Sequence, residues 1–251
     1  IGYEETTLSA FGADVYITML QNSAQVKHVC INDKQALMKS APKNTLFIDC
    51  SSIDVDSSRE IHAYAKELGL LIVDAPVSGG IKGAEAGNLT MMIGGSKKAI
   101  NKALPLFEIL GDKLVMTGSE GTGQAAKICN NMILGISMVG ISEAYALADK
   151  LGLGKEKLFE VSSNASGQCW AMTQYSPVPG LVDNVPSNND YKAGFTAQMM
   201  LKDLLLGQTA SDSTDQKTAL AHRATTIYQN FVDQGYGELD FSGIIKMIEN
   251  Q

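Results

Sequence analysis

The stretch TLFIDCSSIDVDSSREIHAYAKELGLLIVDAPVSGG (45–80) decides the predicted fold. It contains two short and almost continuously apolar runs, TLFIDC (45–50) and LLIVDA (70–75), with a plausible helix over 54–68 between them. Strands that are apolar at consecutive positions suit a sheet that is covered on both faces. Strand–helix–strand alternation therefore predicts an α/β sheet with right-handed crossovers.

The alternation extends outward from this stretch. VYITML (15–20), LTMMIGG (89–95) and KLVMTG (113–118) are further strand candidates, and helices are expected over 33–40 and 97–110. No convincing strand follows Gly121. Residues 122–150 predict one helix of roughly 40 Å at 1.5 Å per residue, and shorter helices are expected over 155–164, 196–208, 216–234 and 240–249. We therefore expect an α/β domain over 1–120 and an all-helical domain over 121–251.

Composition excludes several classes of function. The chain has 251 residues, 45% of them hydrophobic and 19% charged, which is ordinary for a globular protein. Its net charge of −7 argues against a nucleic-acid partner, which would normally meet a basic surface. Uninterrupted apolar windows long enough to span a membrane are lacking, so no membrane partner is expected. Residues 1–10 have neither the basic start nor the apolar core of a signal peptide.

Cysteines and histidines give no metal signal, and no metal is expected. The four cysteines have no metal-like spacing and are expected to be buried free thiols in a reducing compartment: Cys30, Cys50, Cys129 and Cys169. The three histidines are isolated from one another and are each expected at the surface: His28, His62 and His222.

Lys127 and Asn131 are the leading candidates for chemistry. They lie four residues apart in the apolar run GTGQAAKICNNMILGISMVG (121–140), so a helix would place both on one face. Burying an ammonium group is costly unless it is paired or loses its proton, which favours a chemical role for this lysine. The alternative is a lysine whose stem is buried while its amine reaches water.

Two other segments are candidates for ligand binding. DAPVSGG (74–80) directly follows a strand, and its Ser78 hydroxyl and the backbone of Gly79 and Gly80 would suit a substrate carboxylate; the alternative is a plain turn. In LKDLLLGQ (201–208), Lys202 is either a ligand-facing cation or part of an ion pair. GTGQAA (121–126) fits a loose dinucleotide pattern but opens a long helix with no strand after it. Its glycines are therefore expected to permit close packing at the domain junction.

Together these motifs resemble the 3-hydroxyisobutyrate dehydrogenases, which belong to the β-hydroxyacid dehydrogenase family and are relatives of 6-phosphogluconate dehydrogenase. The likeness runs from about residue 14 to residue 241. Its carriers include DAPVSGGIKGAEAGNLTMMIGG (74–95), GTGQAAKICNNM (121–132), MLKDLLLGQ (200–208), SGQCW (166–170), SPVPG (176–180) and VPSNNDYKAGF (185–195). The resemblance implies a doubly wound nucleotide-binding domain joined by a long helix to a helical domain that forms dimers or tetramers.

The resemblance also assigns roles. Lys127 matches the catalytic lysine, which would take the hydroxyl proton of a 3-hydroxy acid as hydride passes to NAD, with NADP not excluded. A free lysine titrates near about 10.4, so burial or nearby cations would have to lower that value. Asn131 matches an amide that helps to hold the substrate, and Ser78–Gly80 match the carboxylate loop. Trp170 and Phe195 are either walls of the substrate pocket or ordinary core aromatics. Cofactor contacts carry over onto four residues: Leu20, Gln21, Ser52 and Lys202.

The chain departs from the family at its start. Family members begin with a strand, a G-x-G-x-x-G turn, a helix and a second strand, whereas this sequence opens near the third strand. Two explanations remain open: the sequence is part of a longer chain, which the intact downstream motifs favour, or it is a natural short form. The alternatives to valine-catabolic 3-hydroxyisobutyrate oxidation are another β-hydroxyacid dehydrogenase or semialdehyde reductase, and a non-catalytic scaffold. A eukaryotic version would be mitochondrial and a bacterial one cytoplasmic.

Overall fold

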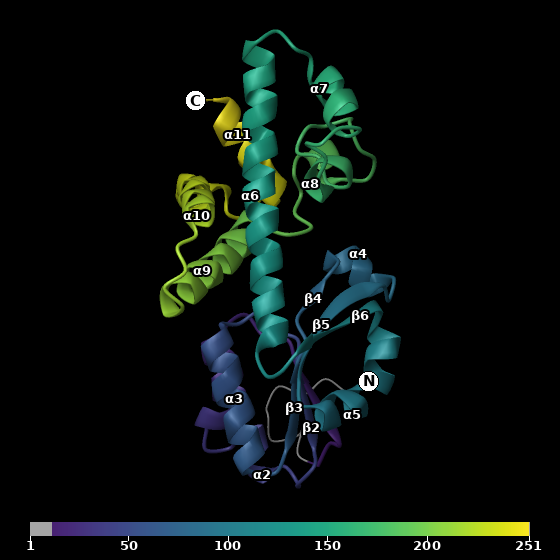
Figure 1. Cartoon of the computed structure of the whole chain (residues 1–251), viewed down its shortest axis with the longest axis vertical. Helices are drawn as coiled ribbons and strands as arrows, with labels where there is room; N and C mark the ends of the chain where they lie inside the picture. The colour runs from purple at the N-terminus through teal and green to yellow at the C-terminus, as the bar shows by residue number, and fades with distance from the viewer. Residues whose placement is uncertain (1–11, 251) are drawn as a thin grey trace. The chain divides into compact units, whose positions relative to one another are not determined.

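The computed structural model describes residues 12–250 and divides into two compact units between Ile128 and Cys129. The first unit is α/β with a Rossmann-like sheet whose first three strands are parallel, and the second is helical (Figure 1). The predicted fold class, a Rossmann-type α/β domain followed by an all-α domain, is confirmed. Helix α6 (Thr122–Lys150) begins in the first unit and continues into the second.

Six strands form the sheet of the first unit, in the order β1-β2-β3-β5-β4 with β6 paired to β5. The first three strands run parallel, with Ile48 opposite Val73 and Asp49 opposite Asp74 in the register of β2 and β3. The strands are β1 (Val15–Thr18), β2 (Leu46–Asp49), β3 (Leu71–Asp74), β4 (Val77–Ser78), β5 (Leu89–Gly95) and β6 (Gly111–Gly118). The five predicted strands are therefore present, and β4 is an additional strand inside the segment expected to be a binding loop or a turn.

The sheet is mixed, unlike the simple alternation that the sequence predicts. β5 runs antiparallel to β3, whereas β6 runs parallel to β5. The reason lies in the connections. Helix α5 (Lys97–Leu110) provides the crossover between the parallel strands β5 and β6, whereas β3 and β5 are joined through β4 and the short helix α4 (Gly80–Glu85). β4 pairs antiparallel with β5, so this connection folds back as a hairpin instead of crossing over.

Both faces of the sheet are covered, as the apolar runs predict. Alternate residues of β2 enter different cores: Phe47 packs with the helices on one face, while Leu46 and Ile48 pack on the other. The first face is covered by α1 (Ser23–Lys27), a π-helical turn (His28–Asn32), α2 (Leu37–Ser40) and α3 (Val55–Glu67). The second face is covered by α5.

The first helical segment differs from its prediction. A helix was expected over 33–40, but only α2 forms there, and α1 with its π-helical continuation occupies 23–32. Asn22 caps α1 by accepting a hydrogen bond from the Gln25 amide, and Val26 and Cys30, four residues apart, are buried. The burial of side chains four residues apart therefore stabilises a helix over residues 23–32 rather than over the predicted range.

The second unit packs around the distal part of α6. Its core contains Met138, Met200, Tyr228, Phe231 and Phe241, which are at most 1% exposed. The remaining elements are α7 (Lys155–Ser162), α8 (Trp170–Thr173), a 3-10 turn (Pro186–Asn189), α9 (Ala197–Ser213), α10 (Ala219–Phe231), a π-helical turn (Val232–Tyr236), a 3-10 turn (Phe241–Gly243) and α11 (Ile244–Glu249). Over 121–250 the structure has isolated bridges but no named strand.

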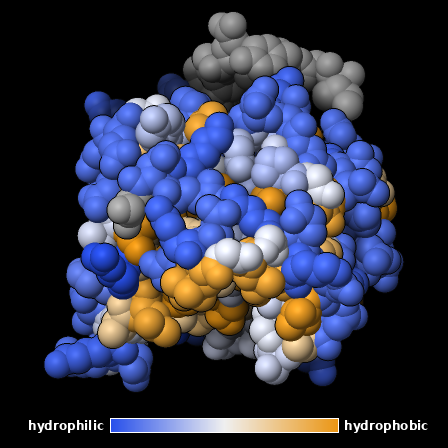
Figure 2. Space-filling model, turned by 90° about the horizontal axis from the view of Figure 1, so that it is seen from above, coloured by the Kyte–Doolittle hydropathy of each residue, from blue (hydrophilic) through white to orange (hydrophobic). Residues whose placement is uncertain are grey.

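Helix α6 is less buried than its apolar sequence indicates. It has the length and mean hydropathy of a membrane span, 1.3 over its most apolar window, and 44% of that window is buried. The core helix of a soluble protein has the same properties. Figure 2 shows one face on which apolar surface gathers between polar side chains. The exposed large apolar side chains of the second unit include Ile133, Leu147, Leu151, Leu153, Val161, Leu205 and Leu220.

The thiols also differ in part from their prediction. All four cysteines are free, and Cys30 and Cys50 are buried, but Cys169 is half-buried and Cys129 is exposed. Burial raises the pKa of the Cys30 and Cys50 thiols to about 12, with a smaller contribution from the charge of Asp49. Cys129 lies on an exposed side of α6, so the apolar character of that run misled the prediction.

Candidate active site

Lys127 lies in the first turns of α6, next to the strand that carries the Ser-Gly-Gly motif. Its half-buried side chain donates a hydrogen bond from Nζ to the carbonyl oxygen of Val77, at 2.8 Å. Val77 immediately precedes Ser78 in β4. The amine that the sequence singled out is therefore placed beside the predicted carboxylate loop, within the first unit.

The predicted carboxylate loop is part strand and part turn. Ser78 pairs with Thr90 of β5 and is half-buried, whereas Gly79 and Gly80 are exposed. The two glycines have φ angles of 136° and 62°, which residues with a Cβ rarely adopt. A Cβ on Gly79 would also lie 3.1 Å from the Leu89 side chain. The glycines are therefore needed for the backbone path, and they leave amide groups of the loop at the surface.

Asp74 caps the start of α6 from another part of the chain. Its two carboxylate oxygens accept hydrogen bonds from the amides of Gly121, at 2.9 Å, and Gln124, at 3.1 Å. The first turn of α6 has no acidic residue of its own, so Asp74 satisfies helix amides that have no intrahelical partner. Gly123 packs against the same strand end, since a Cβ there would lie 2.4 Å from the Met92 carbonyl oxygen. Gly123 therefore packs closely against the sheet of the first unit, whereas close packing at the domain junction stays a prediction.

His62 was expected at the surface, and this prediction is wrong. It is 6% exposed on α3, and its Nε2 lies 3.0 Å from Asp74 Oδ1. Burial acts to raise the pKa of Asp74, but the hydrogen bond and charge of His62, with the two α6 amides, outweigh it and lower that pKa. His28 and His222 are exposed as predicted. The amphipathic pattern of α3 gave no signal for this pair, because its partner lies twelve residues away on β3.

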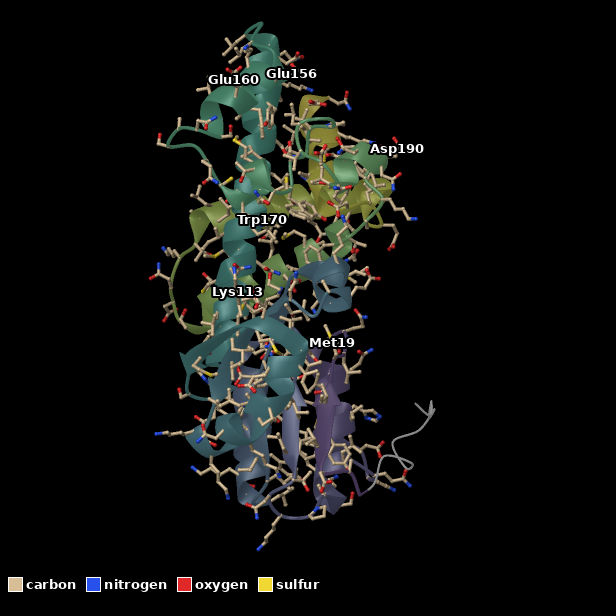
Figure 3. All side chains as sticks on the ribbon, turned by 90° about the vertical axis from the view of Figure 1, so that its right-hand side faces the viewer. Met19, Lys113, Glu156, Glu160, Trp170 and Asp190 are labelled. Carbon is tan, nitrogen blue, oxygen red and sulfur yellow. The ribbon has the colours of Figure 1, made fainter. Side chains whose placement is uncertain are left out.

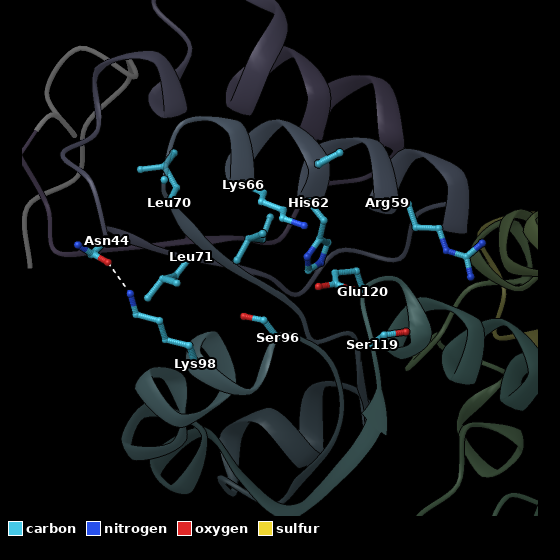
Figure 4. A pocket seen from close by; sticks show the side chains of 13 residues that line it. Asn44, Arg59, His62, Lys66, Leu70, Leu71, Ser96, Lys98, Ser119 and Glu120 are labelled. Carbon is cyan, nitrogen blue, oxygen red and sulfur yellow. Dashed lines mark hydrogen bonds between the residues drawn. The ribbon is translucent and has the colours of Figure 1, made fainter.

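His62 also lines a cavity of about 690 Å³ between α3 and the start of α5. Figure 4 shows Arg59 and Lys98 on opposite sides of this cavity, and Lys98 is hydrogen-bonded to Asn44. The cationic groups do not converge on one point, so the cavity does not form an anion-binding site.

Three of the four predicted cofactor residues, Leu20, Gln21 and Ser52, lie at the carboxyl ends of β1 and β2. The amide of Leu20 donates to Ser51 Oγ at 2.8 Å, which ties the two loops together. Gln21 is exposed and Ser52 is half-buried. Met19, which the sequence analysis did not single out, has 69% of its surface exposed at this edge (Figure 3). In open α/β sheets, ligands bind in the crevice outside the carboxyl ends of the strands.

Asn131 and Lys202 lie in the second unit. Asn131 is 2% exposed, and its amide nitrogen donates to the carboxylate of Asp203 on α9. Lys202, next to Asp203 on the same helix, is half-buried. Asp203 is a buried acid that sequence reasoning gave no role, and its position directly after Lys202 was the available signal. Asn131 follows Lys127 by one turn of α6.

The two aromatic candidates belong to one cluster in the second unit. Trp170, 52% exposed, stacks on Tyr175, which in turn stacks on Phe241; Phe195 meets Phe241 edge-on. Tyr175 donates from its hydroxyl to Asp240 at 2.9 Å. The cluster therefore holds an exposed indole face on a rigid aromatic base.

Comparisons with known proteins agree with this architecture. A family model for the NAD-binding domain of 6-phosphogluconate dehydrogenase matches residues 2–118, and one for the NAD-binding of NADP-dependent 3-hydroxyisobutyrate dehydrogenase matches residues 121–248. The chain belongs to the β-hydroxyacid dehydrogenase family. It is therefore an NAD(P)-dependent 3-hydroxyacid dehydrogenase, as predicted.

Individual relatives of this family cover most of the chain. The NAD-dependent L-serine dehydrogenase of Pseudomonas aeruginosa is 44% identical over 95% of this chain and 80% of its own length. The mitochondrial 3-hydroxyisobutyrate dehydrogenase of Homo sapiens is 40% identical over 95% and 71%. A solved structure of Mycobacterium tuberculosis 3-hydroxyisobutyrate dehydrogenase with L-serine is 42% identical, with a TM-score of 0.92 over 98% of this chain and 83% of that one.

The residues at the carboxyl ends of β1 and β2 fit the NAD cofactor of the family. Met19 presents an exposed apolar side chain that a flat ring can contact, while Gln21 and Ser52 offer polar groups at the same edge. The Leu20 amide is held by Ser51, so the loop is fixed rather than free to collapse into this space. Small hydroxy acids are the substrates of the relatives, and the NAD cofactor predicted from the sequence is confirmed at the level of the family.

Proposed function

We propose that this protein oxidises 3-hydroxyisobutyrate to methylmalonate semialdehyde with NAD, a reaction of valine catabolism. The observation that carries the proposal is the 2.8 Å hydrogen bond from Lys127 Nζ to the carbonyl oxygen of Val77, beside the Ser78–Gly80 loop. A proton-transferring amine and a loop able to bind a carboxylate are the two parts that a 3-hydroxy acid requires.

Lys127 acts as the general base in this proposal. Its neutral amine takes the proton of the C3 hydroxyl, and in the reverse direction its ammonium group returns that proton to the forming alcohol. NAD, when bound, supplies at C4 of its nicotinamide the acceptor for the hydride that leaves the substrate carbon. The Val77 carbonyl accepts from the amine and so fixes the direction in which Nζ points.

Substrate orientation falls to neutral and backbone groups. The hydroxyl of Ser78 and the exposed amides at Gly79 and Gly80 donate to the substrate carboxylate, because hydrogen bonds to a charged acceptor are stronger than neutral ones. Asn131, whose amide is oriented by Asp203, positions the substrate without adding charge. Lys202 adds a cation for the cofactor, as the resemblance implies.

L-Serine is the second candidate substrate. It carries an ammonium group where 3-hydroxyisobutyrate carries a methyl group and is otherwise the same 3-hydroxy acid. The relative named L-serine dehydrogenase and the solved mycobacterial structure with L-serine favour it.

Replacing the proposed base tests the catalytic proposal. Lys127→Ala should lower kcat by at least about a hundredfold while NADH binding, followed by nicotinamide fluorescence, stays within twofold. Lys150→Ala, at the exposed end of the same helix, is the matched control and should keep full activity. Retained turnover in Lys127→Ala would remove this residue from catalysis. Steady-state rates of the wild type with 3-hydroxyisobutyrate, L-serine and tartronate-type acids, each with NAD and NADP, decide the substrate and the cofactor.

The two units would have separate roles. We propose that residues 1–120 form the dinucleotide-binding domain and residues 121–251 the substrate and oligomerisation domain. The exposed apolar side chains of the second unit support a homodimer or homotetramer, because exposed apolar patches mark interaction surfaces. Light scattering of the purified protein tests the subunit number. A eukaryotic source would place the enzyme in the mitochondrial matrix and a bacterial one in the cytoplasm.

A further inference from the structure

Gln124 makes a two-point contact with the loop that follows β2. Its side chain is fully buried, with 0% of the residue exposed. Nε2 donates to the carbonyl oxygen of Ser51 at 2.7 Å, and Oε1 accepts from the amide of Ile53 at 3.1 Å. One side-chain amide therefore satisfies a backbone acceptor and a backbone donor two residues apart, as a neighbouring strand would.

The backbone of Gln124 is held as firmly as its side chain. Its amide donates to Asp74 at the end of β3, at 3.1 Å, so one residue joins the start of α6 to the ends of two strands. Each such hydrogen bond contributes about 1 kcal/mol net, but leaving a buried partner unsatisfied costs about 1–3 kcal/mol. Water cannot replace these contacts at a fully buried site, so the geometry is strongly preferred.

The loop that Gln124 holds is the one proposed to contact the cofactor. Ser51 also accepts the Leu20 amide on its hydroxyl, and Ser52 lies between the two clamped positions. On the other side, Lys127 follows Gln124 by three residues, about 4.5 Å along the helix axis. Gln124 thus connects the proposed cofactor loop to the turn of α6 that carries the proposed base.

We propose that Gln124 is a positioning residue that holds the Ser51–Ile53 loop and the Lys127-bearing turn of α6 in one fixed relation. This inference rests on the proposed function for the roles of the loop and of Lys127. Hydride transfer needs donor and acceptor carbons in near contact, and a misplacement of about 1 Å can lower the rate about a hundredfold. Gln124 touches neither substrate nor cofactor and acts only through the groups that it orders.

Three variants separate positioning from stability. Gln124→Met keeps the size of the side chain and removes both loop hydrogen bonds. Ser51→Ala releases the Leu20 amide and removes the hydrogen bond of the hydroxyl to Asp49, but it leaves the Gln124 contacts to the Ser51 and Ile53 backbone in place. Phe107→Leu, in the fully buried core between α5 and the sheet, is the matched control, because it destabilises the same unit without touching the loop.

Amide hydrogen exchange of the cofactor-free full chain is the first measurement. In Gln124→Met the Ile53 amide should exchange at least about tenfold faster than in the wild type, because its acceptor is gone. In Phe107→Leu, the protection of Ile53 should fall only as much as that of other core amides. Unchanged protection of Ile53 in Gln124→Met would show that the loop does not depend on Gln124 and would overturn the proposal.

Cofactor binding and turnover of the holoenzyme are the second measurement. Gln124→Met should raise the dissociation constant of NADH and lower kcat, each about tenfold, whereas Ser51→Ala should raise the dissociation constant alone. An equal loss of kcat in Phe107→Leu, or no loss in Gln124→Met, would overturn the positioning role. Failure of the proposed function is seen separately, as turnover retained by Lys127→Ala while the exchange result for Ile53 stands.

Discussion

Asp49 and Asp74 are register partners at the last positions of β2 and β3, yet their pKa values shift in opposite directions. Burial is the largest influence on both. At Asp49 it prevails over hydrogen bonds from Ser51 and Thr18, and the charge of Asp74 adds to it, so the pKa is raised. At Asp74 the hydrogen bond and charge of His62, with the two α6 amides, prevail and the pKa is lowered. Only Asp74 has a partner that can carry a positive charge.

The free energy of unfolding of Asp49→Asn should increase, relative to that of the wild type, as pH rises. A carboxyl group whose folded pKa is raised disfavours folding once pH exceeds its unfolded pKa of about 3.9. The difference in free energy of unfolding should therefore grow in favour of Asp49→Asn from pH 4 upward until the folded pKa is passed. Its size is about 1.4 kcal/mol for each unit of pKa shift. Urea unfolding followed by circular dichroism at several pH values measures it, and a constant difference would contradict the prediction.

Asp74→Asn should show the opposite dependence. A group whose folded pKa is lowered stabilises the fold above its unfolded pKa, and that contribution is lost as pH falls through the folded value. The variant should be less stable than the wild type by about 3–5 kcal/mol at pH 7, because a buried partner of His62 is removed, and the gap should narrow below pH 4. Asp112→Asn, at an exposed position of β6, should change the free energy of unfolding by less than about 0.5 kcal/mol. A difference in free energy of unfolding between Asp74→Asn and the wild type that stays constant down to pH 3 would contradict the lowered pKa of Asp74.

The sequence was enough to predict the features that depend on nearby residues, but not the contacts between residues far apart in the chain. Lys127 and its helix follow from an apolar run and an i, i+4 spacing, and the Ser78–Gly80 loop follows from its place after a strand. The bonds from Asp74 to Gly121 and Gln124 join residues 47 and 50 apart, so no spacing rule reveals them. Asp74 and Gln124 both stood inside quoted motifs, but a carboxylate after a strand and an amide in a helix have many uses. Their pairing depends on the strand order.

Gly123→Ala should destabilise the protein strongly. The added Cβ would lie 2.4 Å from the Met92 carbonyl oxygen and 2.6 Å from that of Asp74, and both are backbone atoms at the sheet. The start of α6 would have to move, at a cost of about 3 kcal/mol or more. Gly140→Ala on the same helix has open space and should be neutral or more stable by up to about 1 kcal/mol. Thermal unfolding of both variants measures the contrast, and equal melting temperatures would contradict the packing argument.

Ser78→Ala should weaken substrate binding without weakening cofactor binding. If the hydroxyl donates to the substrate carboxylate, its loss costs about 1.5–3 kcal/mol, a rise of about tenfold to a hundredfold in KM for the hydroxy acid. NADH affinity should remain within twofold, because Ser78 lies on β4 rather than at the carboxyl ends of β1 and β2. Thr90→Ala alters the register partner of Ser78 in β5 and is the matched control for damage to the strand pair. Steady-state kinetics at saturating NAD measure the effect. A similar rise of KM in Thr90→Ala, or none in Ser78→Ala, would assign Ser78 to the architecture of the hairpin and leave the carboxylate to the glycine amides.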